Sequence, residues 1–141
     1  MSLLLDTNVI SELRKGPRAA ASVAQWFEGV AEEDIHLSVL VVGELRRGIE
    51  RVRARDARQA AALDAWLRQV VREHAERILP VDSRVAEEWG RLTAMRSGSV
   101  IDTLMAATAQ VFGLVLVTRN TKDVAWTGVS CLNPFDLSDR P

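Results

Sequence analysis

The sequence has little of what several common protein classes require. Its single cysteine, Cys131, cannot form an internal disulfide or a thiolate zinc site, so we expect a protein of the reducing cytoplasm. No uninterrupted apolar run approaches the roughly 18 residues that a membrane span needs, which predicts no membrane association. Basic and acidic residues nearly balance, 18 against 19, which argues against a function that depends on bulk charge.

Several well-known catalytic motifs are also absent. The chain has no P-loop, no GxGxxG, no GxSxG and no HExxH pattern. Its two histidines, His36 and His74, lie far apart without a cysteine or histidine partner, so each is better interpreted as a surface or half-buried residue than as a metal ligand. The side chains that remain as candidates for chemistry are carboxylates.

The order of hydrophobic patterns predicts the fold class. A length of 141 residues favours one domain over 1–141, and 48% hydrophobic with 26% charged residues is typical of a globular protein. Strands are expected at 3–5, 35–38, 78–81, 114–117 and 129–132. Helices are expected just after residue 7, from residue 17, over 41–53 and 57–75, after 82–83, and over 101–112. This alternation predicts a three-layer α/β domain in which helices flank a short, mainly parallel sheet.

Four acidic residues stand where a catalytic site of such a sheet would lie. Asp6 directly follows the first strand, Asp123 follows the fourth, Asp102 opens a helix rich in small residues, and Glu44 lies beside the apolar stripe of its helix. Each has a simpler interpretation. The role of Asp6 and Asp102 could be merely to cap a turn or a helix. Glu44 could form a surface ion pair with Arg47, and a loop acid such as Asp123 is usually just solvated.

Taken together, the four acids favour a metal site. Two unit charges 4 Å apart repel by about 4 kcal/mol at an effective dielectric constant of 20, so converging carboxylates need protons or a cation. Ligands that are all oxygen favour a hard divalent ion, Mg²⁺ or Mn²⁺, over zinc. Such an ion can neutralise phosphate oxygens and activate a water, which suits phosphodiester hydrolysis.

Four segments, in this order, resemble a known family. They are LLLDTNVI at 3–10, LS at 37–38 followed by GELRRG at 43–48, IDTLMAATA at 101–109, and LVTRNTKD at 116–123. The chain is similar to PIN domains, and more narrowly to the VapC-type toxins of bacterial toxin–antitoxin pairs. The resemblance extends over essentially the whole chain, from residue 3 to residues 133–135.

The resemblance implies a metal-dependent ribonuclease with a defined set of residues. It implies that Asp6, Glu44 and Asp102 are metal ligands and that Asp123 is a fourth acid acting through water. Four polar residues would orient these acids or the substrate, namely Thr7, Asn8, Thr118 and Asn120. In some relatives an acid stands where this chain has Asn120, so either Asn120 or Asp123 could complete the site. The family further implies an RNA substrate, a small cognate antitoxin and a homodimer.

Basic residues add a weaker indication of RNA binding, whereas the aromatic residues are better explained by packing. Arg46, Arg47 and Arg51 belong to an arginine-rich stretch that could contact RNA phosphates, although a solvated helix with internal ion pairs would look the same. The four tryptophans mostly fall at helical core spacing, so we expect them to pack rather than to stack on bases. They are Trp26, Trp66, Trp89 and Trp126.

Two other functions compete with a ribonuclease toxin. One is a catalytically silent PIN-like module that binds RNA or a partner protein, which the intact set of acids disfavours. The other is a phosphatase or receiver domain in which Asp6 accepts a phosphoryl group. A phosphatase of the haloacid dehalogenase type would want a second acid two residues later, where this chain has Asn8, and the match to receiver domains is poor.

Overall fold

A computed structural model describes residues 1–136 and has one five-stranded parallel sheet at its centre. The strands are β1 (Leu3–Leu5), β2 (Ile35–Ser38), β3 (Ile78–Leu79), β4 (Val115–Val117) and β5 (Cys131–Leu132). Their order across the sheet is β3-β2-β1-β4-β5, with every neighbouring pair parallel. The predicted α/β class and mainly parallel sheet are confirmed.

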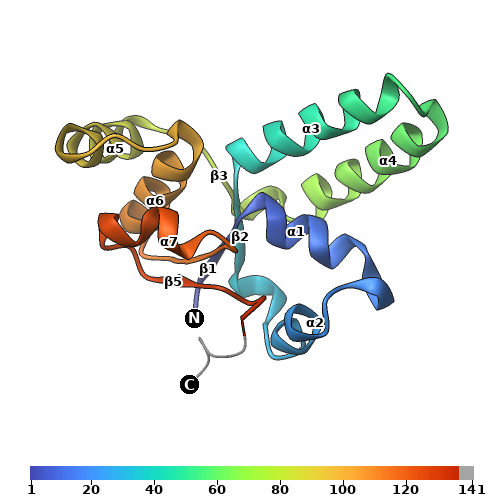
Figure 1. Ribbon diagram of the computed structural model, residues 1–141, viewed down its shortest axis with the longest axis horizontal. Coiled ribbons are helices and arrows are strands. Elements are labelled where there is room, and N and C mark those ends of the chain that lie inside the picture. The colour runs from blue at the N-terminus through green and yellow to red at the C-terminus, as the bar shows by residue number, and fades with distance from the viewer. Residues whose placement is uncertain (137–141) are drawn as a thin grey trace.

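Helices cover both faces of this sheet. They are α1 (Thr7–Arg14), α2 (Ala21–Glu28), α3 (Val39–Arg53), α4 (Ala57–Glu73), α5 (Ser83–Met95), α6 (Val100–Phe112) and α7 (Thr121–Val124). Figure 1 shows α1 to α4 on one side of the sheet and α5 to α7 on the other. The expected three layers are therefore present among the residues that the structure describes. None of the described helices is long and apolar enough to cross a membrane.

The strand order creates a switch point between β1 and β4. From β1 the chain first winds to β2 and β3, and it then returns to place β4 on the other side of β1. In open α/β sheets, ligands bind beyond the carboxyl ends of the strands at such a point. Leu5 pairs with Val117 in the β1–β4 register, so the next residues, Asp6 and Thr118, leave the sheet side by side.

One predicted helix begins later than expected. Residues 16–18 form a single 3-10 turn, and α2 begins only at Ala21. Gly16 has a positive φ of 58°, which interrupts helical geometry, and the Glu12 carboxylate accepts the N–H of Ala20 at 2.8 Å just before α2. Pro17 therefore opens a short turn and not the helix itself.

The core is continuous around the sheet, with a smaller cluster under α5 and α6. Trp26 and Trp66 pack partly buried against the main core, and Trp89 and Trp126 pack against the smaller cluster, which confirms the expectation of packing. His74 is more buried than expected, at 8% exposure, and its Nδ1 lies 2.9 Å from the carbonyl oxygen of Val70. It lies outside the acid cluster described next.

Candidate active site

Asp6 sits where β1 ends and α1 begins, and it is only 8% exposed. Its backbone N–H donates to the carbonyl of Val117 at 2.9 Å, which fixes its position at the sheet edge. One carboxylate oxygen, Oδ1, accepts the N–H of Thr7 at 2.8 Å. Asp6 therefore does cap α1, as the simpler interpretation requires, while its other oxygen lies toward β4.

Polar side chains from the β4 end hold that second oxygen. Thr118 is 1% exposed, and its hydroxyl donates to Asp6 Oδ2 at 2.7 Å. The same hydroxyl accepts the N–H of Asn120 at 3.1 Å. Asn8 donates to Asp6 Oδ2 at 3.4 Å and accepts the N–H of Arg119 at 3.3 Å. The two loops that leave β1 and β4 are thereby joined through the Asp6 carboxylate.

Glu44 reaches the same place from α3. Ser38 caps this helix, because its hydroxyl accepts the N–H of Leu40 at 3.0 Å, so α3 starts at the carboxyl end of β2. The Thr7 hydroxyl donates to Glu44 Oε1 at 2.6 Å. Arg47 lies 3.6 Å from Glu44 Oε2 and has a 59% exposed side chain. Glu44 thus makes the surface ion pair and also contacts the loop that carries Asp6.

Asp102 lies in the first turn of α6 without capping it. The cap is Ser99, whose hydroxyl accepts the Asp102 N–H at 3.5 Å. Within residues 1–136 the Asp102 carboxylate has no hydrogen bond or ion pair. Burial raises the pKa of the Asp102 carboxyl above its ordinary value, and the charges of Asp6, Asp123 and Glu44 raise it further. The other three acids are therefore close enough to Asp102 to repel its charge.

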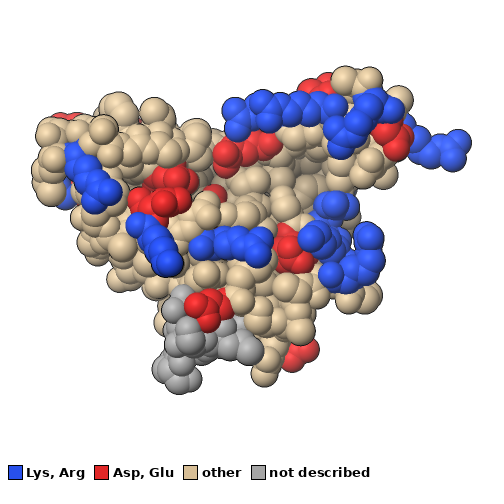
Figure 2. All heavy atoms as spheres, in the orientation of Figure 1, with Lys and Arg blue, Asp and Glu red and all other residues tan. Residues whose placement is uncertain are grey.

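The acids surround a cavity of about 450 Å³. Asp6, Glu44 and Asp102 line it together with Asn120, whereas Asp123 does not line it and contributes its charge from α7. Figure 2 shows carboxylate groups gathered near the middle of this face, with basic side chains on the surrounding surface.

Other predicted polar residues lie at this cavity as well. Thr7, Asn8 and Arg47 line it, and Thr118 lies beneath it against Asp6. Ser99, which was not among the residues predicted from the sequence, also lines the cavity. The Ser-x-x-Asp spacing of a capping box, residues 99–102, is the signal that could have identified it.

The chemistry of the cavity fits a hard divalent cation. Its carboxylates supply oxygen ligands, and among the residues lining the cavity Arg47 is the one cationic side chain. Burial and the neighbouring acids raise the pKa of Asp102, and a bound cation would offset both effects. Among the described residues, no three His, Cys, Asp or Glu side chains already form a coordination shell. Glu44 is held by Thr7 at 2.6 Å and by Arg47 at 3.6 Å.

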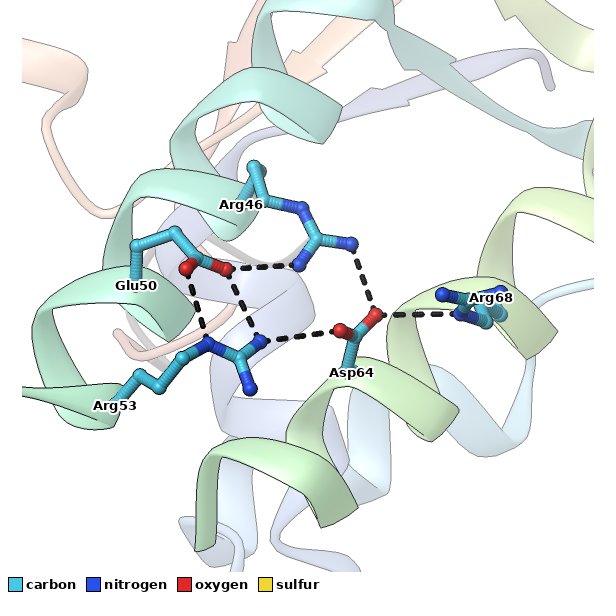
Figure 3. A network of polar contacts seen from close by, with 5 residues as sticks. All are labelled: Arg46, Glu50, Arg53, Asp64 and Arg68. Atoms are coloured by element: carbon cyan, nitrogen blue, oxygen red, sulfur yellow. Dashed lines mark hydrogen bonds and ion pairs between the residues drawn. The ribbon is translucent and has the colours of Figure 1, made fainter. Parts of the chain in front are cut away.

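The predicted RNA-contacting arginines differ in their availability. Arg46 is engaged in an ion-pair network between α3 and α4, where it contacts Glu50 at 3.1 Å and Asp64 at 2.9 Å (Figure 3). Arg53 pairs with both Glu50 and Asp64, and Arg68 pairs with Asp64. Arg47 stands at the cavity, and Arg51 is exposed without an ion pair among the described residues. Arg47 and Arg51 are therefore freer than Arg46 to meet a phosphate.

Comparisons with known proteins agree on one family. Residues 3–125 match the PIN domain family. The chain is 34% identical to the VapC ribonuclease Y4jK of Sinorhizobium fredii, over 95% of this chain and 98% of that protein. The crystal structure of FitAcB from Neisseria gonorrhoeae superposes with a TM-score of 0.86 and 33% identity, covering 96% of this chain and 99% of that one. A toxin–antitoxin complex from Klebsiella pneumoniae superposes with a TM-score of 0.66 and 26% identity, covering 96% and 100%.

Proposed function

This chain belongs to the PIN domain family, among its VapC-type ribonuclease toxins, and we propose that it hydrolyses RNA at the cavity formed by Asp6, Glu44 and Asp102. The observation that carries the proposal is geometric: Asp6, Glu44 and Asp102 line one cavity, and within residues 1–136 the Asp102 carboxylate has no cationic partner. Carboxylates in this arrangement favour a bound divalent cation. The family match over residues 3–125 also supports one PIN domain spanning the chain.

Asp6, Glu44 and Asp102 are the residues that would hold the ion, which we propose to be Mg²⁺ or Mn²⁺, with Asp123 acting through water. When bound, the ion supplies neutralisation of phosphate charge and a more acidic water. Thr118 and Asn8 fix the orientation of Asp6 by donating to its Oδ2, and Thr7 fixes Glu44. Arg47 stands at the cavity edge, where its guanidinium can bind a phosphate of the strand.

The partners that we propose follow from the relatives. A solved relative is described as a toxin–antitoxin complex, which supports a small cognate antitoxin that inhibits this chain. A homodimer remains our proposal from the family resemblance. The alternative of a catalytically silent binding module is disfavoured because Asp6, Glu44 and Asp102 line one cavity.

A cleavage assay tests the proposed activity. We expect the purified protein, freed of antitoxin, to cut single-stranded RNA in Mg²⁺ or Mn²⁺ and to stop in excess EDTA. Cleavage that continues undiminished in EDTA would contradict a metal-dependent site, and binding without any cleavage would favour the silent module.

A further inference from the structure

Asp102 and Asp123 belong to two different helices that meet beside the acid cavity. Asp102 lies in the first turn of α6, after the loop at residues 96–99, and Asp123 lies in α7. The two helices contact each other, and Figure 1 shows them side by side. The relative position of these two acids therefore depends on what holds α7 against the start of α6.

α7 is too short to hold its own position. A helix of four residues gains little stability from its internal hydrogen bonds. Val124, which is 3% exposed, anchors it in the main core. The last carbonyls of a helix have no partner within it, and here two side chains from the following turn bind them. The Thr127 hydroxyl donates to the carbonyl of Val124 at 2.6 Å. The indole N–H of Trp126 donates to the carbonyl of Asp123 at 3.1 Å.

The indole of Trp126 also contacts the segment that leads to Asp102. Its ring packs against the smaller hydrophobic cluster under α5 and α6. The backbone of Gly98 lies close to this ring, because a Cβ added to Gly98 would be 3.4 Å from Trp126 Cζ2 and 3.2 Å from Thr103 Cγ2. The next residue, Ser99, caps α6 by accepting the Asp102 N–H. Trp126 therefore lies between α7 and the loop that begins α6.

The start of α6 is also held by α5. The Thr103 hydroxyl donates to the carbonyl of Ser99 at 2.8 Å and accepts the indole N–H of Trp89, on α5, at 3.0 Å. Thr103 is 1% exposed, so this link is shielded from water. The beginning of α6 is thus fixed to α5, and Trp126 joins α7 to that fixed frame.

We propose that Trp126 is a positioning residue of the acid site, which sets the place of α7, and with it Asp123, relative to Asp102. This inference rests on the proposed function, since the relative position of the acids matters only if they act on one cation. Binding groups must be held within about 0.5 Å of their productive geometry. Packing alone would give Trp126 a role in stability. Its hydrogen bond to Asp123 and its contact with the loop before Asp102 predict a role in metal affinity as well.

Trp126→Phe tests this role. The substitution removes the indole N–H and shortens the ring, while it keeps an aromatic side chain in the cluster. We expect Mn²⁺ to bind about tenfold more weakly, the lower end of what a residue that orients a metal site contributes, and RNA to retain its KM while kcat falls. Trp26→Phe is the control, because Trp26 packs against the main core. Calorimetric titration of Mn²⁺ measures the affinities at a temperature where thermal unfolding shows every variant folded.

Gly98→Ala gives a second test that leaves the indole in place. Its Cβ would force Thr103 or Trp126 to shift by a few tenths of an ångström, so we expect a smaller loss of Mn²⁺ affinity in the same direction. A Cβ added to Gly90, on α5, meets no atom within 4 Å, which makes Gly90→Ala the matched control. If Trp126→Phe does not fold, Gly98→Ala decides the matter.

A double-mutant cycle distinguishes positioning from packing. If Trp126 acts through Asp123, Trp126→Phe should weaken Mn²⁺ binding no more than Asp123→Asn does, and it should add little in the Asp123→Asn background. An unchanged Mn²⁺ affinity in both Trp126→Phe and Gly98→Ala would overturn the proposal. So would a full Trp126→Phe effect in the Asp123→Asn background. Either result would leave the proposed function intact, whereas a wild-type protein that neither binds Mn²⁺ nor cuts RNA would contradict that function.

Discussion

Two clusters of acidic residues, both partly on α3, show opposite charge balance. At the sheet edge, Asp6, Glu44 and Asp123 all act on Asp102, and Arg47 pairs with Glu44 at 3.6 Å. In the α3–α4 network, Glu50 and Asp64 are joined by three arginines (Figure 3). The first cluster has an excess of negative charge and the second an excess of positive charge.

The pKa values follow this difference. Burial and neighbouring acids raise the pKa of Asp102, while the hydrogen bond from Arg46, followed by that from Arg68, lowers the pKa of Asp64 far below its ordinary range. A carboxylate already paired with arginine needs no further partner, so the network joins two helices. The acids at the sheet edge, where Arg47 pairs with Glu44 alone, retain the capacity to bind a cation. Charge balance, more than the number of acids, separates the candidate site from a structural network.

The two clusters should differ most in RNA cleavage when one carboxylate of each is replaced by a neutral amide. Asp102→Asn should abolish RNA cleavage, because it removes a proposed metal ligand while keeping the size of the side chain. Asp64→Asn should leave cleavage close to wild type, since Asp64 lies in the network between α3 and α4. Cleavage rates of the purified variants measure both. Equal losses in the two variants would mean that the clusters do not differ in function.

Glu44→Gln tests whether Glu44 is a metal ligand or only a surface ion-pair partner of Arg47. We expect a loss of several orders of magnitude in cleavage, because a neutral amide is a poor ligand for Mg²⁺. The control is Arg47→Ala, which removes the ion pair at 3.6 Å, should leave metal affinity nearly intact, and should weaken RNA binding in a salt-dependent way. Wild-type cleavage by Glu44→Gln would show that Glu44 is only a surface partner of Arg47.

Thr118→Val tests how much the hydrogen bond from Thr118 to Asp6 contributes to metal-dependent cleavage. The substitution removes the donor 2.7 Å from Asp6 Oδ2 and keeps the β-branched shape. Loss of a hydrogen bond to a metal ligand typically costs about 10- to 100-fold in metal affinity or activity, and we expect that range here. Cleavage measured across a Mn²⁺ titration gives the fold change in metal affinity and in activity. Thr118→Ser should retain most activity, and a Val variant as active as wild type would exclude an orienting role.

The smallest effects concern stability without metal, where the two clusters should respond to pH in opposite directions. The folded state holds the Asp102 proton more tightly than the unfolded chain, so ionised Asp102 destabilises the fold near neutral pH and acidification relieves this. Asp64 has a lowered pKa, so its stabilisation is present above its ordinary value of 3.8 and is lost as the pH falls through the lower folded value.

In EDTA near neutral pH, we therefore expect Asp102→Asn to melt above the wild type and Asp64→Asn to melt below it, each by a few degrees at most. The Asp102→Asn difference should shrink as the pH falls toward 4. The Asp64→Asn difference should shrink only below that pH. Thermal unfolding from pH 4 to 8 measures the first trend, and a sharp drop in the melting temperature of Asp102→Asn would favour a structural role for this carboxylate.

Sequence patterns predicted most of this arrangement because its parts are local. The apolar run at 3–5 followed by Asp6, and the left-handed Gly113 that ends α6, are signals within a few residues. The sheet order is not local, so the pairing of β1 with β4 that places Thr118 against Asp6 appears only in the fold.

Other features depended on contacts between distant segments. Arg46 belonged to an arginine-rich stretch, and nothing in that stretch indicated that Asp64, from the next helix, would engage it. Trp66 had the spacing of a core residue and does pack against the core, yet it also lines a hollow between α1, α3 and α4. A helical pattern predicts which face is buried, but a groove forms only where three helices meet.

The central claim is that the acids lining the cavity at the sheet edge, and not those of the α3–α4 network, bind a divalent cation. Calorimetric titration of Mn²⁺ into the metal-free wild type, Asp102→Asn and Asp64→Asn tests it most directly. The predicted result is binding by the wild type and Asp64→Asn, with binding by Asp102→Asn abolished or greatly weakened. Equal Mn²⁺ affinity in all three proteins, or loss of binding in Asp64→Asn alone, would contradict it.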